Sequence, residues 1–179
     1  DEELCCQKFV KPVEDENGTL LSIDCGLILD GWQADSAFTA MVGNVSEEKR
    51  KLVQVTEECF WIGANMAREG NRLGDLSHAI QMHAEKHGYG VIRDLCGHGI
   101  GTEMHEAPNV PNYGRPGRGV KLQAGMTMTL EPMNSMGTWK VYQEDDGWTI
   151  VTRDGRPCSH YEHTLLITDG EPELLSWPG

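Results

Sequence analysis

Two apolar segments near the start of the chain predict a β-hairpin. Residues Leu20–Leu29 are rich in Leu and Ile, as expected of a strand, and the following Asp30–Gly31 pair is a strong signal for a tight turn. A second strand is expected over Gln33–Val42. Each strand carries one acid, Asp24 in the first and Asp35 in the second, at a spacing compatible with facing positions near the hairpin's open end. Two like charges placed there repel each other unless a cation lies between them, whereas acids at a turn or sheet edge would simply face water.

Two amphipathic helices are expected to follow the hairpin. Ser46 is a good N-cap for the first helix and Gly70 a good stop, and apolar positions between them recur with a period of about 3.6 residues. The second helix is expected over Asp75–His87, with Gly88 closing it. Both apolar stripes indicate core packing, and the stripe of the first helix consists of Leu52, Val55, Cys59, Ile62 and Met66.

The second helix also carries histidines. His83 and His87 have the i, i+4 spacing of a metal-binding pair, but the stretch between them does not follow the H-E-x-x-H pattern. We therefore interpret them as exposed surface histidines.

The rest of the chain alternates short apolar segments with turns. Its predicted extended segments are Tyr89–Leu95, Ala107–Asn112, Thr127–Glu131, one or two strands within Val141–Val151, and a last strand over His160–Ile167. A hairpin, two helices and then several strands predict an α+β fold with a mostly antiparallel sheet and helices on one face.

One stretch, from Leu95 to Glu106, stands out by its chemistry. His98 lies among Gly97, Gly99 and Gly101, and His105 follows seven residues later. Few side chains can cover a histidine among glycines, so we expect His98 to be an exposed, fixed ligand. A purely structural glycine turn remains the alternative interpretation of this stretch alone.

Acidic residues at or near strand ends favour the interpretation of His98 as a ligand over that of a structural glycine turn. Together with the histidine they form a set of five, Asp24, Asp35, His98, Glu131 and Glu162. Four carboxylates carry a charge of about −4, which two divalent cations would neutralise. Oxygen-rich sites with one imidazole suit Mn, Fe, Co or Zn, and paired metals activate water for hydrolysis.

Composition limits the classes of function. The net charge is −13, from 15 basic and 28 acidic residues, which argues against binding to nucleic acid or to an acidic membrane. No apolar run reaches the roughly 18 residues of a membrane span. The six cysteines form no C-x-x-C pair and are interpreted as reduced thiols of a cytosolic protein. With 179 residues, the chain is expected to form a single domain, residues 1–179.

The chain resembles the type 1 methionine aminopeptidases, members of the pita-bread metallopeptidases. The similarity extends from about Leu20 to the end and rests on five blocks in the family's order and spacing. These are Asp24-Cys25-Gly26 with Asp35, Gly97-His98-Gly99-Ile100-Gly101, Met104-His105-Glu106-Ala107-Pro108, Gly125-Met126-Thr127-Met128-Thr129-Leu130-Glu131-Pro132 and Tyr161-Glu162-His163-Thr164. The resemblance implies a curved, mostly antiparallel sheet with helices on its outer face.

The resemblance also implies roles for the five ligands. Asp35 and Glu162 would bridge two divalent metal ions (Co, Mn, Fe or Zn). Asp24 would complete one metal and His98 with Glu131 the other. Glu131 would in addition carry the proton of the attacking water.

Further residues and a substrate follow from the same resemblance. His105 would bind the scissile carbonyl and stabilise its oxyanion, while Met104 and Trp148 would contribute to the methionine pocket. The implied reaction removes the initiator methionine from nascent polypeptides with a small second residue. The implied enzyme is a cytoplasmic monomer, with the ribosome as one place of encounter with its substrate.

Three features depart from the family pattern. Met104 stands before His105 where bacterial members have an aromatic residue, although a flexible thioether can also line a methionine pocket. The family has a substrate-contacting histidine upstream of the first aspartate, but residues 1–23 contain none. We expect the chain to lack part of the N-terminal lobe, with residues 1–19 as its remnant and residues 20–179 as the metal-binding catalytic part. A non-catalytic binding module and a Xaa-Pro-type peptidase of the same fold are therefore the alternatives.

Overall fold

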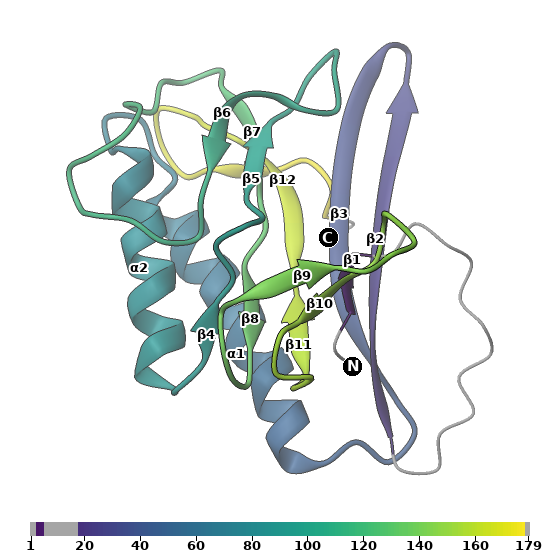
Figure 1. Ribbon diagram of the computed structural model, residues 1–179. Coiled ribbons are helices and arrows are strands. Elements are labelled where there is room, and N and C mark those ends of the chain that lie inside the picture. Colours follow the sequence, from purple (N-terminus) through teal and green to yellow (C-terminus); the bar gives the residue numbers. More distant parts are fainter. Residues whose placement is uncertain (1–2, 6–17, 178–179) are drawn as a thin grey trace.

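The computed structural model describes residues 3–5 and 18–177, in which a long hairpin is followed by two helices and a series of short strands (Figure 1). The predicted order of elements is confirmed, whereas most of the predicted 1–19 remnant lies outside the described residues. The strands are β1 Glu3–Cys5, β2 Thr19–Leu29, β3 Trp32–Val42, β4 Gly90–Val91, β5 Gly97–Gly99, β6 Glu106–Val110, β7 Thr127–Leu130, β8 Met133–Ser135, β9 Val141–Gln143, β10 Ile150–Thr152, β11 Cys158–His160, β12 Glu162–Leu166 and β13 Glu173–Leu174. The helices are α1 Glu47–Met66 and α2 Leu73–Lys86.

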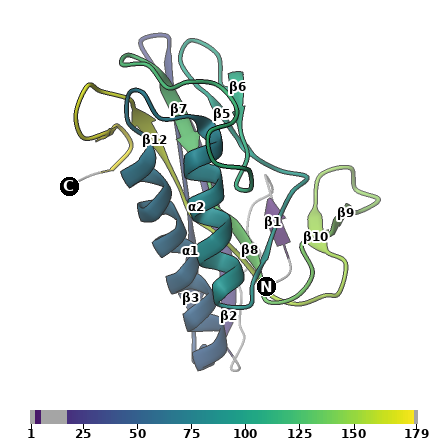
Figure 2. The ribbon, with the colours of Figure 1, turned by 90° about the vertical axis from the view of Figure 1, so that its left-hand side faces the viewer.

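The main sheet has the strand order β2-β3-β12-β7-β5-β6, and β13 also pairs with β12. Smaller sheets of order β11-β8-β4 and β1-β10-β9 accompany it, and all strand pairs in the described residues are antiparallel. The two helices lie side by side on one face (Figures 1 and 2). The α+β prediction is thus confirmed. None of the described helices is long and apolar enough to cross a membrane.

The hairpin forms where the sequence predicts it. Its two strands have eleven residues each and pair without a bulge from Thr19 opposite Val42 to Leu29 opposite Trp32. Asp30 and Gly31 form the turn with φ values of 51° and 84°. Two successive positive φ values define the type I′ turn, whose twist matches that of the flanking strands.

The helices cover the sheet with an apolar core. Ser46 caps α1 as predicted, its side chain accepting a hydrogen bond from the Lys49 amide, but the helix ends at Met66, before Gly70. Side chains from both helices and from β7 and β12 are fully buried in one cluster, which includes Phe60, Leu76, Ile80, Leu130 and Leu165. Because the core lies on this face, the opposite face of the sheet is left for the site.

Two strand predictions were too long. Only Gly90–Val91 of the predicted Tyr89–Leu95 strand pairs, and the predicted last strand is divided at Tyr161 into β11 and β12. The division lies opposite Pro132, which separates β7 from β8, so that β11 pairs with β8 while β12 pairs with β7. Proline lacks the amide proton that a continuous ladder would need. The paired strands therefore change sheets together at this corner.

We expect Gly31→Ala to lower the free energy of unfolding by about 1 kcal/mol, because a Cβ atom is strained at a φ of 84°. Asp30→Asn is the matched control: asparagine also tolerates positive φ, so this variant should unfold like the wild type. Urea unfolding followed by circular dichroism measures both. Equal stability of Gly31→Ala and the wild type would contradict the argument from the turn.

Candidate metal centre

The hairpin presents its two acids on one face of the sheet. Asp24 pairs with Ala37 and Asp35 pairs with Gly26, so the acids are diagonal neighbours, two residues out of register, in the middle of the hairpin. The prediction of facing positions near the open end was wrong, because the tight two-residue turn fixes the register. Although Asp24 is exposed as a residue, partial desolvation of its carboxyl group and the charge of Asp35 raise its pKa to about 6. The acids are thus close enough to repel each other.

His98 lies in β5 and not in an open glycine turn. Its side chain is buried, which corrects the prediction of an exposed ligand: in β5 the imidazole lies at the wall of a cavity against the ring of His105, while the neighbouring glycines let other backbone approach the strand. A Cβ atom on Gly97 would lie only 2.6 Å from the Thr129 carbonyl oxygen. We assign the proton to Nδ1, which lies 2.9 Å from the carbonyl oxygen of Gly99 and donates to it.

That tautomer leaves the other ring nitrogen of His98 free to act as a ligand. Nε2 lies 3.7 Å from Glu131 Oε1 and 3.9 Å from Asp35 Oδ2. Burial lowers the pKa of His98, which favours the neutral imidazole that binds metals. A backbone carbonyl that fixes the tautomer is the usual partner of a metal-binding histidine.

Glu131 and Glu162 lie at the corner where the strands change sheets. Glu131 directly follows β7 and Glu162 opens β12, and both are buried. Burial is the main cause that raises the pKa of Glu131 to about 8, and the charges of Asp24 and Asp35 act in the same direction. The pKa of Glu162 is also raised well above its usual range by burial and by the other three acids.

Two threonines hold these ligands in place. The Thr129 hydroxyl accepts a hydrogen bond from the His98 amide at 3.1 Å and donates to Glu131 Oε1 at 3.0 Å. The Thr164 hydroxyl accepts from the Asp35 amide and donates to the Asp35 carbonyl oxygen, both at 2.9 Å. Each hydroxyl therefore joins elements that are distant in sequence.

All five predicted ligands line one cavity of about 170 Å³. Its lining consists of Asp24, Asp35, Leu95, Cys96, His98, His105, Glu131, Met133, His160 and Glu162. His105 is exposed at this cavity, with its ring centroid 4.3 Å from that of His98.

Met104 and Trp148, which were predicted to contribute to the methionine pocket, lie in different surroundings. The terminal methyl of Met104 lies against Gly26, beside Asp35, and so remains close to the acids. Trp148 is 55% exposed on the loop between β9 and β10, and is not among the described residues that line the cavity.

His160 is the residue that sequence reasoning missed. It is buried, and neither ring nitrogen has a hydrogen-bond partner among the described residues. Nε2 lies 3.5 Å from Glu162 Oε2 and 3.9 Å from Glu131 Oε2. Burial lowers the pKa of His160 to about 4, so the imidazole is neutral. Its position two residues before Glu162, on the same side of an extended segment, is the signal that could have revealed it.

Comparison with known proteins identifies the family. Residues 11–169 match Metallopeptidase family M24. This chain belongs to that family.

Its M24 relatives are methionine aminopeptidases. That of Clostridium acetobutylicum is 54% identical over 159 residues, which cover 89% of this chain and 64% of the relative. That of Clostridium perfringens is 51% identical over 168 residues, covering 94% and 68%. The chain thus spans about two thirds of the length of these relatives.

Solved structures agree with the sequence relationship. The methionine aminopeptidase of Thermotoga maritima aligns with a TM-score of 0.86 and 48% identity, covering 88% of this chain and 63% of that one. Prolidase from Pyrococcus furiosus aligns with a TM-score of 0.69 at 24% identity, covering 89% and 42%, and shares the fold alone. The predicted pita-bread fold is therefore confirmed.

Membership of a metallopeptidase family implies divalent ions, and the M24 chain offers ligands for them. Asp24, His160 and Glu162 form one group with ligand atoms within 4.8 Å of one another, and Asp35, His98 and Glu162 form a second. Both nitrogens of His160 and Oε1 of Glu162 lack partners within the described residues, although all three atoms are buried. A cation would satisfy Oε1 of Glu162 and the unprotonated nitrogen of His160 and would ionise the acids, so the donor set fits divalent metals.

We expect Thr164→Val to weaken both folding and metal binding. Valine has a similar shape but leaves the amide and carbonyl of Asp35 without this partner, which should cost about 1–3 kcal/mol of unfolding free energy. Manganese affinity, measured by calorimetry, should fall about 10–100-fold because Asp35 loses its support. Thr164→Ser keeps the hydroxyl and should behave like the wild type; a serine variant as impaired as the valine variant would contradict the role of the hydroxyl.

His160→Leu should have opposite effects on stability and on binding. Removing a buried imidazole without partners should raise the metal-free unfolding free energy by about 1–3 kcal/mol. The same change should lower manganese affinity, since one candidate ligand is lost. Metal-free urea unfolding and calorimetry measure the two effects. A less stable variant with unchanged affinity would mean that His160 only packs.

Proposed function

We propose that this chain is the metal-binding, catalytic part of an aminopeptidase that removes N-terminal methionine from peptides with a small second residue. One observation carries the proposal: the buried carboxylate of Glu162 belongs to two ligand groups at once. A shared carboxylate is what a site for two neighbouring cations requires. In this proposal Asp24, Asp35, His98, Glu131 and Glu162 would hold the two ions, and His160 would be a further candidate ligand in the group of Asp24 and Glu162.

The bound ions would lower the pKa of water and polarise the scissile carbonyl. The chain's own residues would position the reactants. Oε1 of Glu131 accepts a hydrogen bond from Thr129, which fixes the carboxyl group beside His98. A carboxylate held there is suited to take a proton from the attacking water and to pass it to the leaving amine.

His105 would act on the substrate. It lies outside both ligand groups but lines the same cavity, next to the His98 ring. From this position it would donate a hydrogen bond to the developing oxyanion of the scissile carbonyl.

The acidic surroundings fit a substrate with a free amine. Asp24 is exposed among the cavity-lining acids, and the whole chain carries a charge of −13. A protonated N-terminus is attracted to such a site. Met104, whose terminal methyl lies against Gly26 beside Asp35, and Trp148 would line the methionine pocket. We further propose nascent polypeptides as substrates, with the ribosome as one place of encounter, and a cytoplasmic monomer as the working form.

Methionine specificity is favoured over the proline-directed alternative by the degree of similarity. Relatives named methionine aminopeptidase are 51–54% identical to this chain, whereas the prolidase of Pyrococcus furiosus is 24% identical. A panel of Met-Ala and Xaa-Pro peptides distinguishes the two specificities.

We expect this chain, loaded with Co, Mn or Fe, to release methionine from Met-Ala-Ser. His105→Ala should reduce kcat about 100- to 1000-fold while the number of bound ions stays the same, because it removes an oxyanion donor and no metal ligand. Glu131→Gln should also abolish release, with its metal content measured in parallel. Liquid chromatography of the released methionine gives the rates.

Glu103→Gln is the control, since this exposed residue lies on the same loop as His105 but outside the cavity lining. It should retain wild-type activity. Absence of release by the wild type carrying two ions would overturn the proposed activity, as would equal rates for the wild type and His105→Ala.

A further inference from the structure

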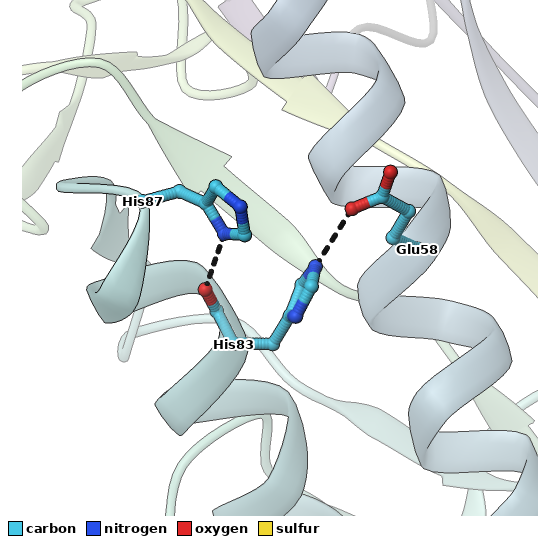
Figure 3. A group of neighbouring side chains, drawn as sticks. All are labelled: Glu58, His83 and His87. Atoms are coloured by element: carbon cyan, nitrogen blue, oxygen red, sulfur yellow. Dashed lines mark hydrogen bonds and ion pairs between the residues drawn. The ribbon is translucent and has the colours of Figure 1, made fainter.

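A second group of metal-binding side chains lies between the helices, separate from the cavity. Glu58 of α1 and His83 and His87 of α2 offer ligand atoms that lie within 4.8 Å of one another (Figure 3). We propose that these three residues form a binding site for one transition-metal ion, of which Zn²⁺ is the best fit. Two imidazoles and one carboxylate are a donor set that zinc takes in proteins.

The geometry orients each donor. Nε2 of His83 lies 2.8 Å from Oε2 of Glu58, so the two side chains meet across the helix interface (Figure 3). The other carboxylate oxygen of Glu58 accepts a hydrogen bond of 2.8 Å from Gln54, one turn earlier. These contacts lower the pKa of Glu58, so the carboxylate is ionised and aimed at the histidines.

His87 completes the group from the end of α2. Its Nδ1 lies 2.9 Å from the carbonyl oxygen of His83, and we assign the proton to Nδ1, which donates to that oxygen. Nε2 then carries the free electron pair that a metal needs. A histidine whose second nitrogen donates to a backbone carbonyl is the usual form of a zinc ligand. The His83 and His87 rings are adjacent, with centroids 4.6 Å apart.

The distances allow an ion to enter with small movements. Bonds of about 2.1 Å in a tetrahedral site place neighbouring ligand atoms about 3.4 Å apart. The Glu58–His83 contact of 2.8 Å would therefore open by roughly half an ångström, within the reach of rotamer adjustments. The proton that Nε2 of His83 donates to the carboxylate would be displaced to Nδ1 as the ion binds. The fourth position would be left to water. The positive charge of Lys51, which lies about one helical turn before Gln54, also lowers the pKa of Glu58.

An ion at this position would join α1 to α2. The two helices contribute to one hydrophobic core. None of the three residues of this group lines the cavity that holds the five predicted ligands. A ligand that binds only the folded chain stabilises it in proportion to the logarithm of its concentration. The site is therefore expected to act as a zinc-dependent clamp on the helix pair.

Zinc stoichiometry tests the proposal without relying on peptidase activity. Wild-type chain and the variants His87→Gln, Glu58→Gln and His78→Gln are titrated with Zn²⁺ in competition with a chromogenic chelator. His78 lies on the same helix but outside the group, so its variant is the matched control. We expect His87→Gln and Glu58→Gln to bind one ion fewer than the wild type and His78→Gln. Ions held by the acidic cavity contribute equally to all four counts.

Thermal unfolding gives a second measurement. Excess Zn²⁺ should raise the melting temperature of the wild type and of His78→Gln more than that of His87→Gln. Of the two ligand variants, His87→Gln is more informative than Glu58→Gln, because it leaves the contact between Glu58 and His83 in place.

Nuclear magnetic resonance of ¹⁵N-labelled histidine tests the site in the wild type, so the result does not depend on whether a variant folds. Saturating Zn²⁺ should shift the Nε2 signals of His83 and His87, while Nδ1 of His87 stays protonated. Equal zinc counts in all four proteins, or unchanged His83 and His87 signals, would overturn the site and leave the Glu58–His83 contact as an ordinary ion pair.

Discussion

Repulsion among carboxylates is the constraint on which the rest of this structure depends. Asp24, Asp35, Glu131 and Glu162 come from separate segments and line one cavity. Two of the four are nearly fully buried, and burial raises the pKa of each of these two before any neighbouring charge is considered. Without cations the acids relieve their repulsion by holding protons, and with cations they ionise. Folding the hairpin onto the corner of the sheet is favourable only where one of these two solutions is available.

The surrounding fold limits how far the acids can move apart. Asp35 is tied by its backbone to Thr164, and Glu131 is tied by its side chain to Thr129. These hydroxyls belong to neighbouring strands of the same sheet, β7 and β12. Acids on so rigid a frame cannot spread into solvent when they ionise, so the frame favours a cation over expansion. Ligands held on strands are therefore already positioned before a metal ion binds, and this preorganisation favours binding.

Local signals in the sequence were sufficient for much of the fold. The Asp30–Gly31 turn, the Ser46 cap and the helical apolar stripe each depend on a few neighbouring residues. The turn and the cap were confirmed, and the stripe was confirmed for Leu52, Val55 and Cys59, whereas its last two residues are half-buried. The five ligand positions were selected through acids on apolar strands and through resemblance to a family. Their mutual arrangement was not accessible, because the register that offsets Asp24 from Asp35 and the break at Tyr161 are set by partners far along the chain.

The surroundings of the histidines could not be predicted either, because they too depend on residues far along the chain. His98 was expected to be exposed because its sequence neighbours are glycines, but its ring is buried beside Asp35 and Glu131, which come from other segments of the chain. His160 was missed although it lies two residues before Glu162, because its burial and its contact with Glu131 arise only where the strands meet at the sheet corner. His83 and His87 were read as surface residues since their third partner, Glu58, lies on another helix.

His98 and His87 nonetheless share one local device. In each, the Nδ1 atom lies 2.9 Å from a backbone carbonyl oxygen within four residues, which leaves Nε2 as the free ligand atom. A side chain that can satisfy Nδ1 locally has its ring orientation and tautomer set before any long-range partner arrives. Long-range packing then decides only what Nε2 meets. At β5 it lies beside Asp35 and Glu131, whereas at the end of α2 His87 belongs to a group with a single carboxylate, Glu58, so the same local geometry serves two environments of different charge.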